Sequence, residues 1–459
     1  MSQLPFSSVK ALPETALDNL ARLGYEHMTD IQALTLPPAL EGKDLIAQAK
    51  TGSGKTTAFG LPLLLKLNPR FFGVQALVMC PTRELSTQVA DELRRLARFQ
   101  ANLKIVVLSG GVSIGPQIAS LEHGAHVVVG TPGRIKDHLR KNTLDLSQLS
   151  TLVLDEADRM LDMGFRDDIL DIAAQSSSKR QTLLFSATYP DNIGALSQSL
   201  QNAPVRIEVE AVHQHNAINQ HLILCNRDDK KEMMRRAISH FGISQAVIFC
   251  NTRQVVSEVT EYLRNQGYMT LALHGDLEQR DRDQVYVQFR QGSAHFLVAT
   301  DVAARGLDVD DLQAVINYEL PRDPEVYVHR IGRTGRAGKE GLALSLANEK
   351  EDYKREAIAA QQGFSIPVLA ASDLTRQSAI EKPAMVTLCI GSGRKNKLRP
   401  GDILGALTSA GGITGASVGK IDVLDFVAYV AVERSQANAA LNHLQKSRIK
   451  NQSVKVRRV

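Results

Sequence analysis

A chain of 459 residues is too long for one hydrophobic core, and at about 150 residues per domain it predicts three domains. Hydrophobic residues make up 43% and charged residues 22%, which is ordinary for a globular protein, and no apolar run approaches the roughly 18 residues of a membrane span. The N-terminus lacks the basic-then-apolar pattern of a secretory signal, so we expect a cytoplasmic protein with no membrane partner.

The charge is unevenly distributed. Residues 383–459 hold six lysines, six arginines and four acidic residues, a net charge of +8, whereas the whole chain carries +5, so the first 382 residues sum to −3. A basic tail on a mildly acidic body predicts that the tail contacts a polyanion, with solubility alone as the alternative. The four cysteines are far apart and include no CxxC pair, which predicts buried free thiols rather than a zinc site or disulfides.

Short apolar runs alternate with helical stretches from Met1 to about Glu208, which predicts a parallel sheet covered by helices on both faces. The alternation lapses over residues 208–219, which we interpret as a linker, and then resumes as a second lobe of the same kind without a second phosphate loop. The expected strands are Ala76–Cys80, Ile105–Leu108, His126–Val129, Leu152–Leu154 and Thr182–Phe185, then Val247–Cys250, Thr270–Leu273, Phe296–Ala299, Ala314–Ile316 and Leu342–Leu346.

A third, smaller unit follows a weakly patterned stretch, Phe364–Pro383. Its pattern predicts four strands and two helices in the order βαββαβ, which fits an RNA-recognition module. The expected elements are a strand at Met385–Ile390, a helix at Pro400–Leu407, strands at Ile421–Val423 and Val427–Val432, a helix at Gln436–Leu444 and a strand at Val454–Val456.

A phosphate-binding loop is predicted at residues 49–56, which read AKTGSGKT where a strand would turn into a helix. Glycines let the backbone curl until several N–H groups point at one anion, and the N-terminus of the new helix adds its positive end. Lys55 would then reach the β- and γ-phosphates of a nucleotide, and the hydroxyl of Thr56 would bind Mg²⁺. A glycine-rich surface turn is the alternative.

Two further clusters support nucleotide chemistry. Asp155-Glu156-Ala157-Asp158 follows an apolar run, where a nucleotide-bound Mg²⁺ needs a second anchor and a glutamate can orient the attacking water. In the second lobe, Arg333 and Arg336 are three residues apart, so a helix would place both on one face, from which they could meet a γ-phosphate. For Arg330 a solvated face and a nucleic-acid contact remain equal alternatives.

These residues resemble the DEAD-box family of ATP-dependent RNA helicases, in the family's order from Tyr25 to Gly338. The resemblance implies two tandem RecA-like lobes and an adenine-reading segment in which Gln32 bonds to the base and Phe6 stacks on it. It also implies that Ser186-Ala187-Thr188 couples the nucleotide to RNA. The implied ATP contacts are Phe6, Tyr25, Gln32, Thr51, Gly52, Ser53, Gly54, Lys55, Thr56 and Asp308, with Thr56 and Asp155 on Mg²⁺ and with Lys55, Asp155, Glu156, Arg333 and Arg336 as catalytic residues.

RNA contacts are implied in both lobes by the same resemblance. In isolation Gln279 and Arg282 are better explained as a solvated helix face, and only their place in the series of motifs favours RNA contact. The implied contacts are Pro81, Thr82, Arg83, Gly111, Thr131, Pro132 and Arg134 in the first lobe and Gly275, Gln279, Arg282 and Thr300 in the second.

The tail resembles the RNA-recognition domain of the DbpA branch, helicases directed to a structured ribosomal RNA. An ordinary module of this kind stacks bases on aromatics of its central strands. Here those positions are Leu388, Val427 and Tyr429, so only Tyr429 keeps the aromatic, and the basic loops become the stronger RNA contacts. The basic residues are Arg394, Lys395, Lys397, Arg399, Lys446, Arg448 and Lys450.

The expected architecture is therefore a RecA-like lobe at residues 1–209, a second at 217–364 and a ferredoxin-like RNA-binding domain at 383–459. The resemblance implies a monomeric, RNA-dependent ATPase that unwinds or remodels structured RNA. It further implies 23S ribosomal RNA as the target during large-subunit assembly, in association with pre-ribosomal particles. An ATP-gated RNA clamp that does not separate strands and a DNA-directed motor are the alternatives.

Overall fold

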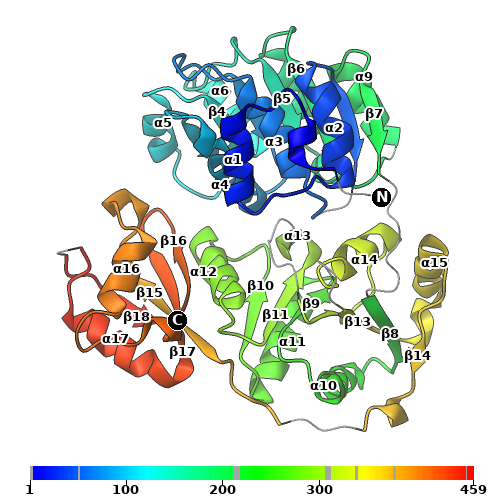
Figure 1. The fold of residues 1–459 in the computed structure, drawn as a ribbon. Coiled ribbons are helices and arrows are strands. Elements are labelled where there is room, and N and C mark those ends of the chain that lie inside the picture. The colour runs from blue at the N-terminus through cyan, green and yellow to red at the C-terminus, as the bar shows by residue number, and fades with distance from the viewer. Residues whose placement is uncertain are drawn as a thin grey trace. The chain divides into compact units, whose positions relative to one another are not determined.

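The computed structural model describes residues 4–49, 52–189, 191–209, 218–304, 312–335, 340–375, 379–450 and 452–459. These residues divide into two compact units, one ending at residue 209 and the other beginning at residue 218. The first unit is one α/β lobe. The second unit contains another α/β lobe and the small C-terminal domain (Figure 1).

Seven parallel strands form the sheet of the first lobe, in the order β3-β4-β2-β5-β6-β1-β7. The central strands are mainly apolar and every residue in them is buried, as expected of a sheet covered on both faces. The strands are β1 (Leu45–Gln48), β2 (Ala76–Met79), β3 (Ile105–Leu108), β4 (Val127–Gly130), β5 (Thr151–Leu154), β6 (Gln181–Ser186) and β7 (Val205–Glu208).

Helices cover both faces of this sheet, and their buried side chains form two separate cores (Figure 1). One core contains α1 (Glu14–Arg22), α2 (Asp30–Leu40), α3 (Lys55–Leu65) and α4 (Arg83–Leu96). The other contains α6 (Pro132–Arg140), α7 (Ala157–Asp162), α8 (Arg166–Ala174) and α9 (Asp191–Leu200), and α5 (Gly115–Leu121) lies after β3.

The second lobe repeats this plan with a parallel sheet in the order β10-β11-β9-β12-β13-β8-β14. Its strands are β8 (Ile218–Leu224), β9 (Ala246–Cys250), β10 (Thr270–Leu273), β11 (Phe296–Thr300), β12 (Ala314–Asn317), β13 (Gly341–Ala347) and β14 (Val368–Leu369). Its helices are α10 (Lys230–Phe241), α11 (Arg253–Asn265), α12 (Gln279–Arg290), α13 (Asp301–Ala304), α14 (Pro324–Ile331) and α15 (Asp352–Gln362).

The C-terminal domain is an antiparallel sheet in the order β16-β17-β15-β18, packed against two helices. Its elements follow the expected βαββαβ order: β15 (Met385–Ile390), α16 (Pro400–Leu407), β16 (Val418–Val423), β17 (Ala428–Glu433), α17 (Ala437–Lys446) and β18 (Val456–Arg458). The predicted fold class is confirmed in all three parts.

The predicted strands match observed ones, most of them to within a residue or two at each end, but three strands at or next to a sheet edge were missed. The predicted linker was wrong at both ends, because Glu208 closes β7 and Ile218 and Asn219 open β8; residues 210–217 lie outside the described part of the chain. The stretch after Phe364 includes the short strand β14, which pairs with β8.

The cysteines are free, and three are buried while Cys225 is half-buried. Within the described ranges, no helix is both long and apolar enough to cross a bilayer. The same ranges hold no cluster of three or more His, Cys, Asp or Glu side chains arranged to bind a metal ion.

Two glycines near the end of β4 should respond in opposite ways to replacement by alanine. A Cβ on Gly130 would lie 2.2 Å from the carbonyl oxygen of Leu108, whereas a Cβ on Gly133, inside α6, would meet nothing within 4 Å. We expect Gly130→Ala to lower the free energy of unfolding by about 1–3 kcal/mol and Gly133→Ala to raise it by about 0.4–1 kcal/mol. Urea unfolding of both variants checks this, and equal effects would contradict the packing described for Gly130.

Candidate nucleotide and RNA site

The predicted phosphate loop joins β1 to the N-terminus of α3. Gly54 is the N-cap of α3 and has φ +91°, a left-handed conformation that suits glycine. Lys55 is buried, and its Nζ donates to the carbonyl oxygen of Ala49 at 2.9 Å, within the same loop. The ammonium group of Lys55 is thus bound by a backbone carbonyl at the start of the same loop. Thr56 follows on the first turn of α3.

The adenine-reading segment contacts this loop. Gln32 is 1% exposed, its Nε2 donates to the carbonyl oxygen of Gly54 at 3.1 Å, and its Oε1 accepts from the N–H of Thr29 at 2.9 Å. Phe6 is 2% exposed and packs edge-on against Tyr25, with ring centroids 6.4 Å apart. The structure therefore places Phe6 in the core of the lobe, which does not fit the expectation of an open ring for base stacking.

Asp155 and Glu156 lie directly after β5 and are both buried. Burial raises the pKa of Asp155 to about 6 against the opposing effect of Lys55, and its Oδ1 has no hydrogen-bond partner among the described residues. Glu156 has φ +53°, and its Oε2 accepts from Nη1 of Arg159 at 3.0 Å. Arg159 was not predicted, although its i,i+3 spacing from Glu156 was a usable signal.

Asp158 links the end of β5 to the end of β6. Its Oδ2 accepts hydrogen bonds from the N–H groups of Ala187 and Thr188 and from the Thr188 hydroxyl, at 3.0–3.1 Å. Burial alone would raise the pKa of Asp158, but the charge of Lys55 and these hydrogen bonds hold it below its usual value. The acidic segment and Ser186-Ala187-Thr188, predicted separately, are therefore directly connected.

The predicted RNA contacts of the first lobe lie at the starts of α4 and α6. Thr82 caps α4 by accepting from the N–H of Leu85 at 3.2 Å, and Pro81 and Thr82 are buried, with Arg83 beginning the helix. Gly111 is exposed with φ +74°. Thr131 and Arg134 line a hollow of about 510 Å³, together with Gly110, Gly133, Lys136, Asp137, Arg140, Phe165 and Asp168. Pro132 is buried at the start of α6.

The predicted contacts of the second lobe lie at the carboxyl ends of β10 and β11. Gly275 is exposed after β10, and Gln279 and Arg282 lie half-buried on the first turn of α12. Nη2 of Arg282 donates to the carbonyl oxygen of Ala303 at 3.3 Å, which brings α12 to the segment that follows Thr300.

Arg330 is neither solvated nor open to nucleic acid, so both alternatives left by the sequence were wrong. It is 2% exposed, and its Nε and Nη2 donate to the two carboxylate oxygens of Asp301 at 2.6 and 2.7 Å. Its other hydrogen bonds go to Asn251, Asn317 and the carbonyl oxygen of Glu319, at 2.7–3.1 Å. All five donors of the guanidinium group are used.

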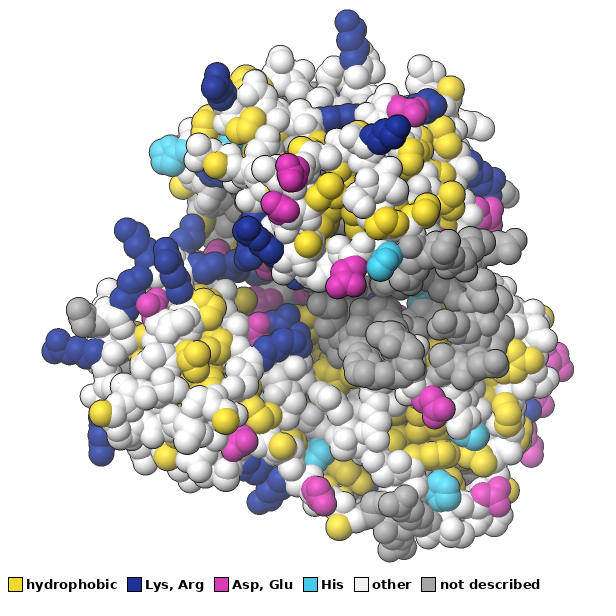
Figure 2. Space-filling view, in the orientation of Figure 1, with side chains coloured by type: hydrophobic (Ala, Val, Ile, Leu, Met, Phe, Trp, Pro, Cys, Tyr) yellow, Lys and Arg dark blue, Asp and Glu magenta, His cyan; other side chains and the backbone are white. Residues whose placement is uncertain are grey.

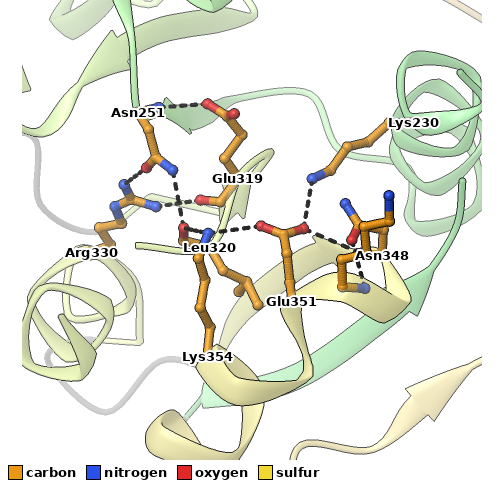
Figure 3. A network of polar contacts seen from close by, with 9 residues as sticks. Lys230, Asn251, Glu319, Leu320, Arg330, Asn348, Glu351 and Lys354 are labelled. Carbon is orange, nitrogen blue, oxygen red and sulfur yellow. Dashed lines mark hydrogen bonds and ion pairs between the residues drawn. The ribbon is translucent and has the colours of Figure 1, made fainter. Parts of the chain in front are cut away.

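This network extends into α15 (Figure 3). The carbonyl oxygen of Leu320 accepts from Nδ2 of Asn251 at 3.1 Å and from Nζ of Lys354 at 3.2 Å. Lys354 and Lys230 both donate to Glu351. Lys354 therefore links the residues around Arg330 to the ion pair between Lys230 and Glu351. The network fixes the helix that precedes Arg333.

Arg333 itself lies beyond that helix, because α14 ends at Ile331. The expectation that Arg333 and Arg336 share a helical face is therefore not met for Arg333. Its carbonyl oxygen accepts from the N–H of Leu312 at 3.2 Å. Thr51, Asp308 and Arg336 lie outside the described residues.

The sheet of the C-terminal domain packs against α12 of the second lobe. Tyr429 is 1% exposed and forms a buried cluster with Cys389 and Val287. The prediction of Tyr429 as an RNA contact was wrong, because its ring is covered by the second lobe. The assignment of Leu388 to the base-stacking face was also wrong, since its side chain belongs to the core formed with α16 and α17.

Polar pairs surround this cluster. Arg290 forms an ion pair with Asp422, and Nε2 of Gln291 donates to Asp422 at 2.9 Å. The hydroxyl of Thr387 donates to Oε1 of Gln291 at 2.9 Å. No sequence signal identified these residues, because each pair joins positions 96 to 132 residues apart. The seven basic residues predicted in the loops of this domain are all exposed.

Comparisons with family models agree with this three-part architecture. Residues 29–196 match the DEAD/DEAH box helicase model, residues 229–338 the helicase conserved C-terminal domain and residues 387–458 the DbpA RNA binding domain. The chain belongs to the DEAD-box family of ATP-dependent RNA helicases. It is 49% identical over 456 residues to the ATP-dependent RNA helicase DbpA of Escherichia coli, covering 98% of this chain and 99% of that relative.

Solved helicase structures support the arrangement within the lobes. Saccharomyces cerevisiae Dbp5 bound to RNA and ADP BeF3 is 30% identical, with a TM-score of 0.73 over 80% of this chain and 96% of Dbp5. Mss116p bound to ssRNA and AMP-PNP is 28% identical, with a TM-score of 0.72 over 80% of each chain. The chain is thus an ATP-dependent RNA helicase of the DbpA type, with an RNA-binding domain at its C-terminal end.

Asp155→Asn should make the ligand-free helicase more stable at neutral pH. Because the pKa of Asp155 in the fold is about 6, above its ordinary 3.8, folding takes up a proton between these values, and stability falls as pH rises through them. Asparagine avoids that loss, so its advantage should grow from about pH 4 to pH 6 and then stay at about 3 kcal/mol. Urea unfolding across this range measures it.

The control is Asp18→Asn, which alters an exposed carboxylate in the same lobe and should show no such trend. If Asp155→Asn gives the same pH profile of stability as the parent, the pKa of Asp155 is not raised in the folded protein.

Proposed function

We propose that this helicase hydrolyses ATP to unwind or remodel structured RNA, with 23S ribosomal RNA as its target during assembly of the large subunit. The proposal rests on one observation above all, the presence of a +8 DbpA-type domain packed directly on the second lobe. We further propose that the enzyme acts as a cytoplasmic monomer in contact with pre-ribosomal particles.

In the proposed mechanism the first lobe binds the nucleotide. The N–H groups of Gly52, Ser53 and Gly54 hold the phosphates, and Lys55 leaves the carbonyl oxygen of Ala49 to bind them. Gln32, already in contact with Gly54, bonds to the adenine, with Tyr25 beside it. We keep Thr51 and Asp308 among the proposed nucleotide contacts.

The residues present fit a magnesium ion. Oδ1 of Asp155 is buried and has no hydrogen-bond partner in the described part of the chain, and a hard cation would satisfy it, with the hydroxyl of Thr56 as a second oxygen ligand. When bound, Mg²⁺ would neutralise negative charge on the phosphates. Glu156 would orient the attacking water, and Arg159, which holds its carboxylate in the structure, would set that orientation.

The second lobe would complete the site with Arg333 and Arg336 as arginine fingers. Hydrolysis then requires both lobes, and RNA contacts at the starts of α4, α6 and α12 would tie that requirement to RNA binding. The RNA contacts would be those predicted from the sequence, except for Tyr429.

The test of this function is ATPase activity against a panel of RNAs. We expect structured fragments of 23S ribosomal RNA to stimulate hydrolysis far more than single-stranded RNA or DNA of equal length. Equal stimulation by DNA would favour a DNA-directed motor. A strand-displacement assay on a short duplex, with and without ATP, separates unwinding from an ATP-gated clamp, since a clamp would leave the duplex intact.

Arg333→Ala should bind ATP and RNA but hydrolyse ATP very slowly. Losing an arginine finger costs about 10³ to 10⁵ in rate, because the charge of the transition state is no longer stabilised. The matched control is Arg322→Ala, an exposed arginine of the same lobe just before α14, which should keep the parent's rate. Single-turnover hydrolysis at saturating RNA measures both, and turnover within a few-fold of the parent would remove Arg333 from the mechanism.

A further inference from the structure

The aromatic residue that the C-terminal domain presents to solvent is not on its sheet. Tyr429, the aromatic of the sheet, is covered by Val287. Phe426 is 64% exposed, although most phenylalanines of a globular protein are buried. It lies in the turn between β16 and β17, next to Leu424 and Val427, whose side chains pack on the cluster around Tyr429. The two ends of the turn are therefore packed on the protein, while the ring of Phe426 points away from the core.

A basic loop, residues 392–399, is fastened to this turn. The N–H groups of Arg394 and Lys395 donate to the carbonyl oxygens of Leu424 and Asp425 at 2.8 and 2.9 Å. A Cβ on Gly393 would lie 2.4 Å from the carbonyl oxygen of Leu424, so glycine permits this close approach. The backbone segments that carry the ring and the cations are consequently held next to each other.

Further cations adjoin the same loop. Nζ of Lys450 donates to the carbonyl oxygen of Lys397 at 2.7 Å, which joins the C-terminal loop to the basic loop. Arg394, Lys395, Lys397, Arg399 and Lys450 are all exposed. In Figure 2 dark-blue Lys and Arg side chains stand out along the edge of this domain, at the left of the view.

We propose that Phe426 is the base-stacking residue of the C-terminal domain, and that an unpaired base from a hairpin loop or bulge of RNA stacks on its ring. The phosphates beside that base then lie on Arg394 and Lys395. A fully paired helix does not fit, because its bases are covered on both faces by their neighbours, whereas an unstacked base offers a free face to an aromatic. This inference rests on the proposed RNA-binding function and names the class of nucleotide that the domain takes.

The stacking surface has moved from the sheet to the turn, because the sheet is used to bind the second lobe. Along β17 the side chains alternate, with Val430 in the core against the helices and Tyr429 in the cluster with Val287. Both faces of this strand are thus occupied by protein. The ends of β17 remain available to RNA, and the end next to β16 carries the exposed ring of Phe426 and adjoins the basic loop.

The experiment compares Phe426→Ala, Phe426→Leu and Phe426→Tyr in the full-length chain. The ligand is the 23S ribosomal fragment that stimulates the parent most, and its affinity is measured by fluorescence anisotropy over a range of salt concentrations. Stacking on an aromatic predicts a loss of about tenfold to a hundredfold in affinity for Ala and Leu, and a change of less than about threefold for Tyr. The salt dependence should stay at the parent's slope, since no phosphate contact is lost.

Arg394→Ala provides the contrast, because it should reduce the slope of log affinity against log salt by about one. The midpoint of urea unfolding should be unchanged in all four variants, which shows that the fold is intact. Parent-like affinity of Phe426→Ala would overturn the inference, and parent-like affinity of Phe426→Leu would show an apolar contact without stacking and overturn it as well.

Failure of the proposed function would look different. It would appear in the parent itself, as equal binding of ribosomal fragments and unrelated RNAs. In that case the same three variants are measured on a single-stranded RNA oligonucleotide, and an equal affinity of Phe426→Ala and the parent there again overturns stacking.

Discussion

Asp155 is a buried carboxylate whose charge is not fully compensated by the first lobe. An ionised carboxylate that is taken out of water needs a charge or hydrogen-bond donors around it. Oδ2 of Asp158 has three donors and Glu156 has Arg159, but Oδ1 of Asp155 has none among the described residues, and the pKa of Asp155 is raised to about 6. The neighbouring carboxylates are paired, so one oxygen at the end of β5 is left to be satisfied by a ligand. That arrangement lowers the stability of the ligand-free lobe and favours the cation proposed for it.

Much of the fold could be predicted because the central strands are short runs of β-branched and aliphatic residues, buried on both faces. Strands such as Ile105–Leu108 and Thr270–Leu273 were predicted at their observed ends. The missed strands lie at or beside the edges. Val205–Glu208 mixes charged and apolar residues, because it pairs with only one neighbour and keeps one side near solvent, so its sequence lacks the continuous apolar pattern.

The candidate site likewise contains residues that the sequence could predict and residues that it could not. The phosphate loop and the acidic segment could be predicted because their chemistry depends on residues next to one another in sequence. The burial of Arg330 could not, since its partners Asn251 and Asp301 are 79 and 29 residues away. The prediction for Tyr429 was wrong for the same reason, because its environment is set by Val287 on another domain. The position of Phe6 is likewise set by its packing against Tyr25. Spacing in the sequence carries no information on such contacts.

Arg330 also connects two parts of the proposed mechanism within the second lobe. Its guanidinium group pairs with Asp301, which directly follows Thr300, the proposed RNA contact at the end of β11. Two residues past the helix that carries Arg330, the backbone of Arg333 is held by Leu312. Arginine stays charged at any physiological pH and all five of its donors are used, so the end of β11 cannot shift without breaking this ion pair or moving α14 with it. The proposed RNA contact at Thr300 and the placement of Arg333 therefore depend on the same buried interaction.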